Sequence, residues 1–140
     1  MSSGKVFIDT SGFFALLSKD DAAHQRCAEW MATARALRTA FVTSDHVLSE
    51  TATLLAARGR GHLAALLFDL VDAGATQGLC LEHVDEDRFR AARDRFLRHL
   101  GAGYSFCDCT SMVVLRELRL TKVLTTDRHF AAAGFEALLA

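Results

Sequence analysis

Short runs of apolar residues alternate with longer amphipathic stretches along the chain. The runs cover residues 6–8, 40–43, 79–84 and 122–125, and a weaker run covers 135–138. Runs of this length that are bounded by turn-forming residues are typical of strands buried on both faces of a sheet. The pattern therefore predicts four strands and a weak fifth strand near the end of the chain.

The stretches between the runs carry apolar residues at the spacing of one face of an α-helix. Helices are predicted over residues 12–17, 22–37, 45–58, 62–72, 85–100 and 107–118, with a short one from residue 128. Strands that alternate with helices indicate a parallel sheet covered on both faces. We therefore expect a three-layer α/β/α, Rossmann-like domain with a short parallel sheet of four to five strands.

Composition narrows the class of protein. A chain of 140 residues suits a single domain over residues 1–140, and an apolar content of 51% allows a real core. A formal net charge of −1 argues against a protein that coats nucleic acid by charge alone. The four cysteines form no CxxC pair, so we expect them to be reduced. Because the sequence has neither a secretory segment nor a membrane-length apolar run, we expect a soluble cytoplasmic protein.

Four carboxylates occupy positions where an α/β sheet usually binds its ligand. Asp9 follows the first predicted strand, and Asp127 follows the fourth. Asp108 stands at the start of a helix after a glycine-rich turn, and Glu50 lies within the helix that follows the second strand. Ligands of open α/β sheets bind outside the carboxyl ends of the strands. We therefore expect these four side chains to meet in one cleft.

Carboxylates gathered in one cleft repel one another, and divalent cations remove this conflict. A site with oxygen ligands alone favours hard cations such as Mg²⁺ or Mn²⁺. Two such ions can hold a phosphate, activate a water molecule and stabilise the leaving oxygen. The set therefore predicts metal-dependent hydrolysis of a phosphodiester.

Each carboxylate also has a structural interpretation. Asp9 could cap a helix, and Asp127 could belong to a turn. Asp108 would be favoured by the helix dipole at its position, and Glu50 could be an exposed helical residue. The functional hypothesis therefore rests on the whole set and its placement rather than on any one member.

The order of these motifs resembles the PIN domain family and, more narrowly, its VapC-like toxins. The similar segments are residues 7–11 (FIDTS), 43–50 (TSDHVLSE), 104–111 (YSFCDCTS) and 124–130 (LTTDRHF). They occur in the order of the family and extend over nearly the whole chain. The resemblance implies a Mg²⁺- or Mn²⁺-dependent endoribonuclease that hydrolyses RNA phosphodiester bonds, most simply the toxin of a toxin–antitoxin pair.

The resemblance also implies roles for individual residues. Asp9 and Asp108 would be the principal metal ligands. Glu50 would bind metal directly or through water, and Asp127 would complete the cluster. Three small hydroxyl side chains would orient carboxylates or waters near the site. These are Thr10, Ser11 and Thr126.

The partners implied by the resemblance are an RNA substrate, a cognate antitoxin protein and a second copy of the chain in a homodimer, with no membrane. The antitoxin would bind an apolar groove between the early helices. Candidate groove residues, which would serve a core equally well, are Phe13, Phe14, Trp30 and Leu55. A housekeeping RNA-processing PIN nuclease and a non-catalytic PIN-like interaction module are the alternatives.

Two other classes of α/β protein lack support in the sequence. Phosphatases of the haloacid dehalogenase type need a second Asp two residues after the first, where this chain has Ser11. Dinucleotide-binding domains need a glycine-rich first turn, which residues 9–12 do not form.

Basic and aromatic residues are candidates for contacts with RNA. Arg58 and Arg60 lie at a helix end, and five further arginines lie within residues 88–98, where a solvated helix face is the alternative. His46 precedes Glu50 by one helical turn, so the two could share a metal. His129 and Tyr104 could contact substrate or serve the structure.

Overall fold

The protein is described by a computed structural model that covers residues 4–74 and 76–140. The strands are β1 (Val6–Ile8), β2 (Phe41–Ser44), β3 (Leu79–Glu82), β4 (Lys122–Leu124) and β5 (Glu136–Ala137). The helices are α1 (Thr10–Leu17), α2 (His24–Ala36), α3 (Asp45–Ala57), α4 (Gly61–Gly74), α5 (Glu86–Arg98), α6 (Phe106–Glu117) and α7 (Arg128–Ala132). A short 3₁₀ helix, η1, covers Leu100–Ala102.

The strands form one parallel sheet in the order β3-β2-β1-β4-β5. β1 lies at the centre, where Phe7 pairs with Val42 of β2 and with Val123 of β4. All three residues of β1 are buried, as expected for a strand covered on both faces. This order places the ends of β1 and β4 side by side, and the two strands are followed by Asp9 and Asp127.

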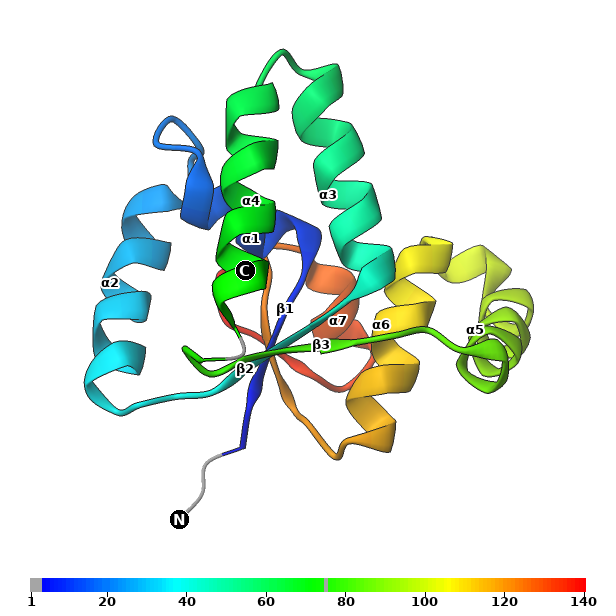
Figure 1. Cartoon of the computed structure of the whole chain (residues 1–140). Helices are drawn as coiled ribbons and strands as arrows, with labels where there is room; N and C mark the ends of the chain where they lie inside the picture. The colour runs from blue at the N-terminus through cyan, green and yellow to red at the C-terminus, as the bar shows by residue number, and fades with distance from the viewer. Residues whose placement is uncertain (1–3, 75) are drawn as a thin grey trace.

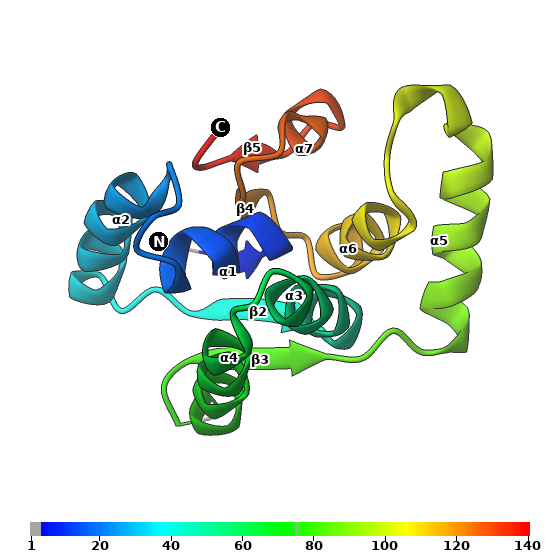
Figure 2. The same cartoon turned by 90° about the horizontal axis from the view of Figure 1, so that it is seen from above.

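Helices flank the sheet on both faces, so the three-layer α/β/α prediction is confirmed. Because crossovers between parallel strands are almost always right-handed, this strand order is expected to put the helices that link β1, β2 and β3 on one face and those that lead to β4 and β5 on the other. Figure 1 shows α3 and α4 standing next to each other, and Figure 2 shows α5 at the outer edge of the molecule beside α6. None of the helices in the described part of the chain is long and apolar enough to cross a membrane.

The core lies between the sheet and its helices. Its largest fully buried side chains include Phe7 of β1, Phe13 of α1 and Phe130 of α7. Leu55 of α3 is also fully buried. Phe13 and Leu55, which the sequence offered for a partner groove, therefore belong to the core. All four cysteines are free, as predicted.

Element boundaries differ from the predictions by a few residues, and side chains account for two of the differences. The second helix was predicted from residue 22 but begins at His24, because the Asp21 carboxylate accepts the Ala23 N–H in a turn before it. The third strand was predicted to residue 84 but ends at Glu82. The Val84 N–H donates to the Asp45 carboxylate instead of to a neighbouring strand.

Gly12 sets the close packing of α1 on the sheet. A Cβ atom at this position would lie 2.1 Å from the Leu124 carbonyl oxygen of β4, well inside any permitted contact. The absence of a side chain therefore lets the first turn of α1 rest on the β4 backbone. This contact brings Asp9, Thr10 and Ser11 next to the residues that follow β4.

Candidate active site

The four predicted carboxylates line one cleft of about 490 Å³ at the carboxyl edge of the sheet. Asp9 comes from the end of β1 and Asp127 from the end of β4, while Glu50 projects from α3 and Asp108 from α6. The expectation that these side chains meet is therefore confirmed as geometry. Residues more than a hundred positions apart in the chain become neighbours through the pairing of β1 with β4.

Asp9 is the most buried of the four carboxylates. Asp9 is only 4% exposed, and its Oδ2 accepts a hydrogen bond of 3.0 Å from the Thr125 hydroxyl. Asp9 occupies the N-cap position of α1, yet its side chain makes no capping hydrogen bond. The structural interpretation of Asp9 as a helix cap is therefore wrong.

Two carboxylates of the cleft, Asp9 and Asp108, show raised pKa values. Burial, together with the neighbouring charges of Asp108 and Glu50, raises the pKa of Asp9 to about 7. Burial is also the main cause that raises the pKa of Asp108, and Asp127 and Glu50 add to it. Such a set of oxygen donors fits hard divalent cations, whose charge would let the acids ionise together.

Asp108 combines a capping role with its place in the cleft. The Ser105 hydroxyl accepts the Asp108 N–H at 2.9 Å, and Asp108 Oδ2 accepts the Ser105 N–H at 3.1 Å, so the pair forms a capping box at the start of α6. The interpretation of Asp108 as a carboxylate in the first turn of a helix is therefore correct, and the capping box adds hydrogen bonds that the sequence did not predict. The same bonds hold the carboxylate in the lining of the cleft.

Glu50 is held by a hydroxyl from the neighbouring helix. The Thr10 hydroxyl donates to Glu50 Oε1 at 2.8 Å, and Thr51 of α3 donates to Thr10 at 3.3 Å. Thr10 therefore contacts one of the four carboxylates, which is the kind of contact that the family resemblance implied for it. Glu50 is half-buried rather than an exposed helical residue.

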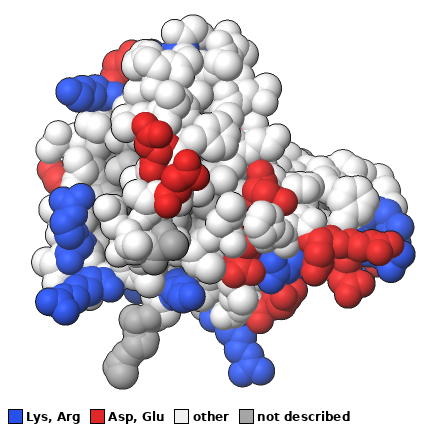
Figure 3. All heavy atoms as spheres, in the orientation of Figure 1, with Lys and Arg blue, Asp and Glu red and all other residues white. Residues whose placement is uncertain are grey.

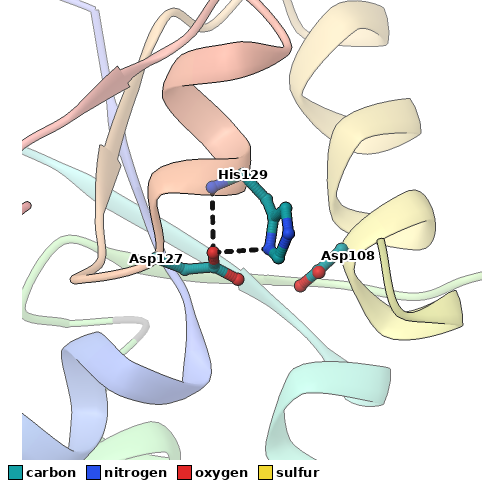
Figure 4. A group of neighbouring side chains, drawn as sticks. All are labelled: Asp108, Asp127 and His129. Atoms are coloured by element: carbon teal, nitrogen blue, oxygen red, sulfur yellow. Dashed lines mark hydrogen bonds and ion pairs between the residues drawn. The ribbon is translucent and has the colours of Figure 1, made fainter. Parts of the chain in front are cut away.

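Asp127 caps α7 and pairs with His129. Its Oδ1 accepts the His129 N–H at 2.9 Å and lies 2.8 Å from the imidazole Nδ1 of the same residue. Figure 4 shows the imidazole of His129 beside both Asp127 and Asp108. Within residues 4–74 and 76–140, these three acidic and imidazole side chains form a group in which one ligand atom of each lies within 4.8 Å of the other two.

Thr125 is the site residue that the sequence did not single out. Its fully buried hydroxyl donates to Asp9 and accepts the Asp127 N–H at 3.0 Å. Because its proton is engaged by Asp9, Thr125 accepts the proton of Ser11 across 2.9 Å, and Ser11 in turn accepts the Thr126 N–H. A single threonine thus links the ends of β1 and β4.

The other predicted hydroxyls differ in how they contribute. The Ser11 hydroxyl hydrogen-bonds to Thr125 and to the Thr126 N–H, and so holds the loop that follows β4. Thr126 takes part through its backbone N–H, which donates to Ser11. The structure therefore gives Ser11 an indirect link to Asp9 and gives the Thr126 side chain no hydrogen-bonded contact with a carboxylate among the described residues.

The structure also shows which of the histidine and tyrosine candidates lie at the cleft. His46 does not join Glu50 in a metal-binding group within the described part of the chain, whereas His129 lines the cleft. Tyr104 packs edge-on between His99 and His129, with ring centroids 6.1 Å and 5.6 Å away. Its position is that of a support for the His129 ring.

Comparison with known proteins agrees with this geometry. A family model described as PIN domain matches residues 6–136. The 23S rRNA-specific endonuclease VapC20 of Mycobacterium tuberculosis, from two strains, is 35% identical over 130 residues, which are 93% of this chain and 95% of the relative.

A solved structure is similar over the same extent. The crystal structure of Mycobacterium tuberculosis VapC20, titled a sarcin–ricin loop cleaving toxin, matches with a TM-score of 0.82 and 32% identity. The match covers 94% of this chain and 96% of that chain. Sequence, fold and relatives agree with the resemblance seen in the motifs, and the chain belongs to the PIN domain family.

Proposed function

We propose that this protein is a divalent-metal-dependent endoribonuclease and the toxin of a toxin–antitoxin pair, acting in the cytoplasm. The observation that carries the proposal is the convergence of Asp9, Glu50, Asp108 and Asp127 in one cleft of a PIN domain. The named activity of the VapC20 relative, an endonuclease, supports the same chemistry. The fold alone would not support this chemistry, since one fold serves many functions.

Asp9 and Asp108 are the principal metal ligands in this proposal, and Glu50 and Asp127 complete the set. Bound Mg²⁺ or Mn²⁺ would neutralise phosphate charge and make a bound water more acidic. The protein contributes the geometry. Thr10 and Thr125 donate hydrogen bonds that orient Glu50 and Asp9, and the capping box with Ser105 orients Asp108. Carboxylates held this way need little reorganisation when the substrate arrives.

Arg58 is the arginine best placed to hold the RNA backbone. It lines the same cleft as the carboxylates, and its guanidinium lies over the Phe14 ring, 5.0 Å from the centroid. Stacking on an aromatic ring restrains the guanidinium while leaving its N–H groups free for phosphate. Arg60, the other candidate at this helix end, is held instead by two hydrogen bonds to Asp20.

The arginines of α5 fit a solvated and structural face better than an RNA-binding one. Arg88 pairs with Glu82 and Glu117, and Arg90 pairs with Glu86. Figure 3 shows acidic and basic side chains together over this helix, at the right of the view. RNA is therefore expected to bind at the cleft rather than along α5.

The sarcin–ricin loop of 23S rRNA is the first substrate to test. The VapC20 relative is a 23S rRNA-specific endonuclease, and its crystal structure is that of a toxin that cleaves this loop. Similarity over nearly the full length of both chains supports the same class of target for this protein.

The antitoxin is proposed to bind a groove of about 440 Å³ between α2 and α4. Apolar side chains line the groove, among them Leu16, Met31 and Leu70. Two basic side chains, Arg35 and Arg38, also line it. An amphipathic helix with acidic flanks would match this surface. The homodimer implied by the family resemblance is part of the same proposal.

The proposal is tested by incubating purified protein with total bacterial RNA and Mg²⁺ or Mn²⁺, beside an Asp108→Asn variant and a reaction with EDTA. Metal-dependent cuts that are absent from the variant and from the EDTA reaction are expected, with fragment ends in 23S rRNA. Cuts that persist in the variant would overturn the assignment of the cleft. Specific ends at the processing sites of precursor RNA instead would favour the housekeeping alternative.

A further inference from the structure

His129 lines the cleft and is not among the four carboxylates of the proposed metal site. It is the second residue of α7, two positions after Asp127, and its side chain is 44% exposed. Figure 4 shows its imidazole in the space between Asp127, which follows β4, and Asp108 of α6. The ring therefore faces two of the proposed ligands at once.

The separations between these three side chains suit a shared ion. One ligand atom from each of Asp108, Asp127 and His129 lies within 4.8 Å of the other two. Divalent ions hold protein ligands at about 2.0 to 2.2 Å, so ligand atoms of one ion lie up to about 4.4 Å apart. Small side-chain adjustments would therefore close the group around a cation.

The hydrogen bonds of the group leave oxygens available for this purpose. His129 engages Oδ1 of Asp127 through both its N–H and its Nδ1, and Ser105 engages Oδ2 of Asp108. Among the described residues, Oδ2 of Asp127 and Oδ1 of Asp108 accept no hydrogen bond from the protein. Each aspartate thus keeps one oxygen for a ligand.

The ring of His129 is also held in place from its other side. Tyr104 packs edge-on against it, with ring centroids 5.6 Å apart. A Cβ atom on Gly103 would lie 3.2 Å from Nε2, and Gly103 has a φ of +81°, which favours glycine. Gly103 and Tyr104 therefore pack closely against the imidazole and hold it beside the carboxylates.

The geometry points to His129 as a nitrogen ligand that joins Asp108 and Asp127 around one divalent cation of the proposed nuclease centre. The inference rests on the proposed function and adds a ligand to it. Carboxylates alone suit Mg²⁺ and Mn²⁺ equally, whereas imidazole favours transition metals over Mg²⁺. A mixed oxygen and nitrogen site therefore selects Mn²⁺ over Mg²⁺.

The experiment uses Mn²⁺ itself as the probe and pulsed electron paramagnetic resonance as the readout. Electron spin echo modulation detects a nitrogen nucleus that is bound directly to Mn²⁺. Wild-type protein with Mn²⁺ is expected to show ¹⁴N modulation, which changes to the ¹⁵N pattern when only histidine is labelled with ¹⁵N. The labelled wild type makes the test independent of whether any variant folds.

Two variants assign the nitrogen to one histidine. His129→Gln is expected to lose the modulation and to bind Mn²⁺ at least about tenfold more weakly, with a smaller change for Mg²⁺. His46→Gln, on the helix that carries Glu50, is the matched control and is expected to keep both. Loss of the modulation in His46→Gln but not in His129→Gln would overturn the inference.

The readouts also separate this inference from the proposed function. If wild-type protein binds Mn²⁺ and cleaves RNA without nitrogen modulation, His129 only orients Asp127 by hydrogen bonding, and the inference fails while the nuclease assignment stands. If wild-type protein neither binds Mn²⁺ nor cleaves RNA, both fail.

Discussion

At the scale of single residues, the buried hydroxyl of Thr125 connects more of the site than any carboxylate does. It donates to Asp9, accepts the Asp127 N–H and accepts the proton of Ser11. A threonine at the end of a strand attracts no attention in a sequence, because β-branched residues are common there. Its role depends on which strand lies next to β4, and the hydrophobic pattern does not specify strand order.

Replacing Thr125 with Val keeps its shape and removes its hydroxyl. We expect the Thr125→Val variant to cleave RNA about 10- to 100-fold more slowly, because Asp9 loses the donor that orients it. The free energy of unfolding should fall by about 1–3 kcal/mol, because buried polar groups lose their partner. Single-turnover cleavage and denaturant unfolding measure the two effects.

Thr125→Ser is the matched control for this prediction, since it keeps the hydroxyl and loses only a methyl group. It should retain most of the cleavage rate. If Val and Ser variants are equally slow, packing of the methyl group matters rather than the hydrogen bonds.

The pKa of Asp9 predicts how the metal-free protein responds to pH. Because the pKa is raised from 3.8 to about 7, the folded state binds the proton more tightly than the unfolded state. The contribution of Asp9 to stability is therefore largest at low pH and falls as the pH rises through this window. The effect is at most about 4 kcal/mol, at about 1.4 kcal/mol for each pKa unit.

Asp9→Asn tests this prediction, because an amide keeps the shape and cannot ionise. In EDTA, the variant should be more stable than wild type above pH 7 and should show a flatter dependence of melting temperature on pH. A wild-type protein whose stability rises between pH 4 and pH 7 through Asp9 would contradict the account of its burial.

At the scale of elements, the crossing of α1 over β4 places the two halves of the site together. The crossing depends on Gly12, where a Cβ atom would lie 2.1 Å from a backbone oxygen. A backbone atom cannot move aside as a flexible side chain can. The sequence pattern predicted both elements but not the contact between them, because a glycine within a helix has several possible causes.

Gly12→Ala should therefore destabilise the protein by about 3 kcal/mol or more, as overpacking does in a core that cannot expand. The same variant should lose cleavage activity, since α1 would move away from β4 and separate Asp9 from Thr125. Gly61→Ala is the control, because nothing lies within 4 Å of a Cβ atom there. Equal stability of the two variants in a urea titration would refute the contact.

The sequence predicted most of the elements because their burial repeats with the period of a helix or a strand. Asp9 and Asp127 could be predicted as site residues because they lie at or within a few residues of the carboxyl ends of strands. Glu50 and Asp108 were less certain from local pattern, since a helical carboxylate has many uses. Their place in the cleft follows from the angles at which α3 and α6 pack, which only the folded structure specifies.

At the scale of the whole molecule, the cleft couples metal binding to stability. Carboxylates that repel one another destabilise the metal-free fold, and a bound cation removes this cost. A ligand that binds only the folded state stabilises it by about 2.7 kcal/mol at a concentration 100 times its dissociation constant.

Mn²⁺ should therefore raise the melting temperature of wild-type protein in a concentration-dependent way. Asp108→Asn should show a much smaller rise, because it loses a proposed ligand. A rise of the same size in both proteins would mean that the metal binds elsewhere. Differential scanning fluorimetry over a Mn²⁺ series measures this directly.

The central claim is that four carboxylates from four parts of the chain act as one nuclease centre. Its most direct test is single-turnover cleavage of a synthetic sarcin–ricin loop hairpin by wild-type protein and by Asp9→Asn, Glu50→Gln, Asp108→Asn and Asp127→Asn. The account predicts metal-dependent cleavage by wild type and slower cleavage by every folded variant. For Asp9→Asn and Asp108→Asn, the loss of rate should exceed the roughly 10- to 100-fold loss expected when only a supporting contact is removed. Cleavage by wild type in EDTA, or wild-type rates in a variant of Asp9 or Asp108, would contradict it.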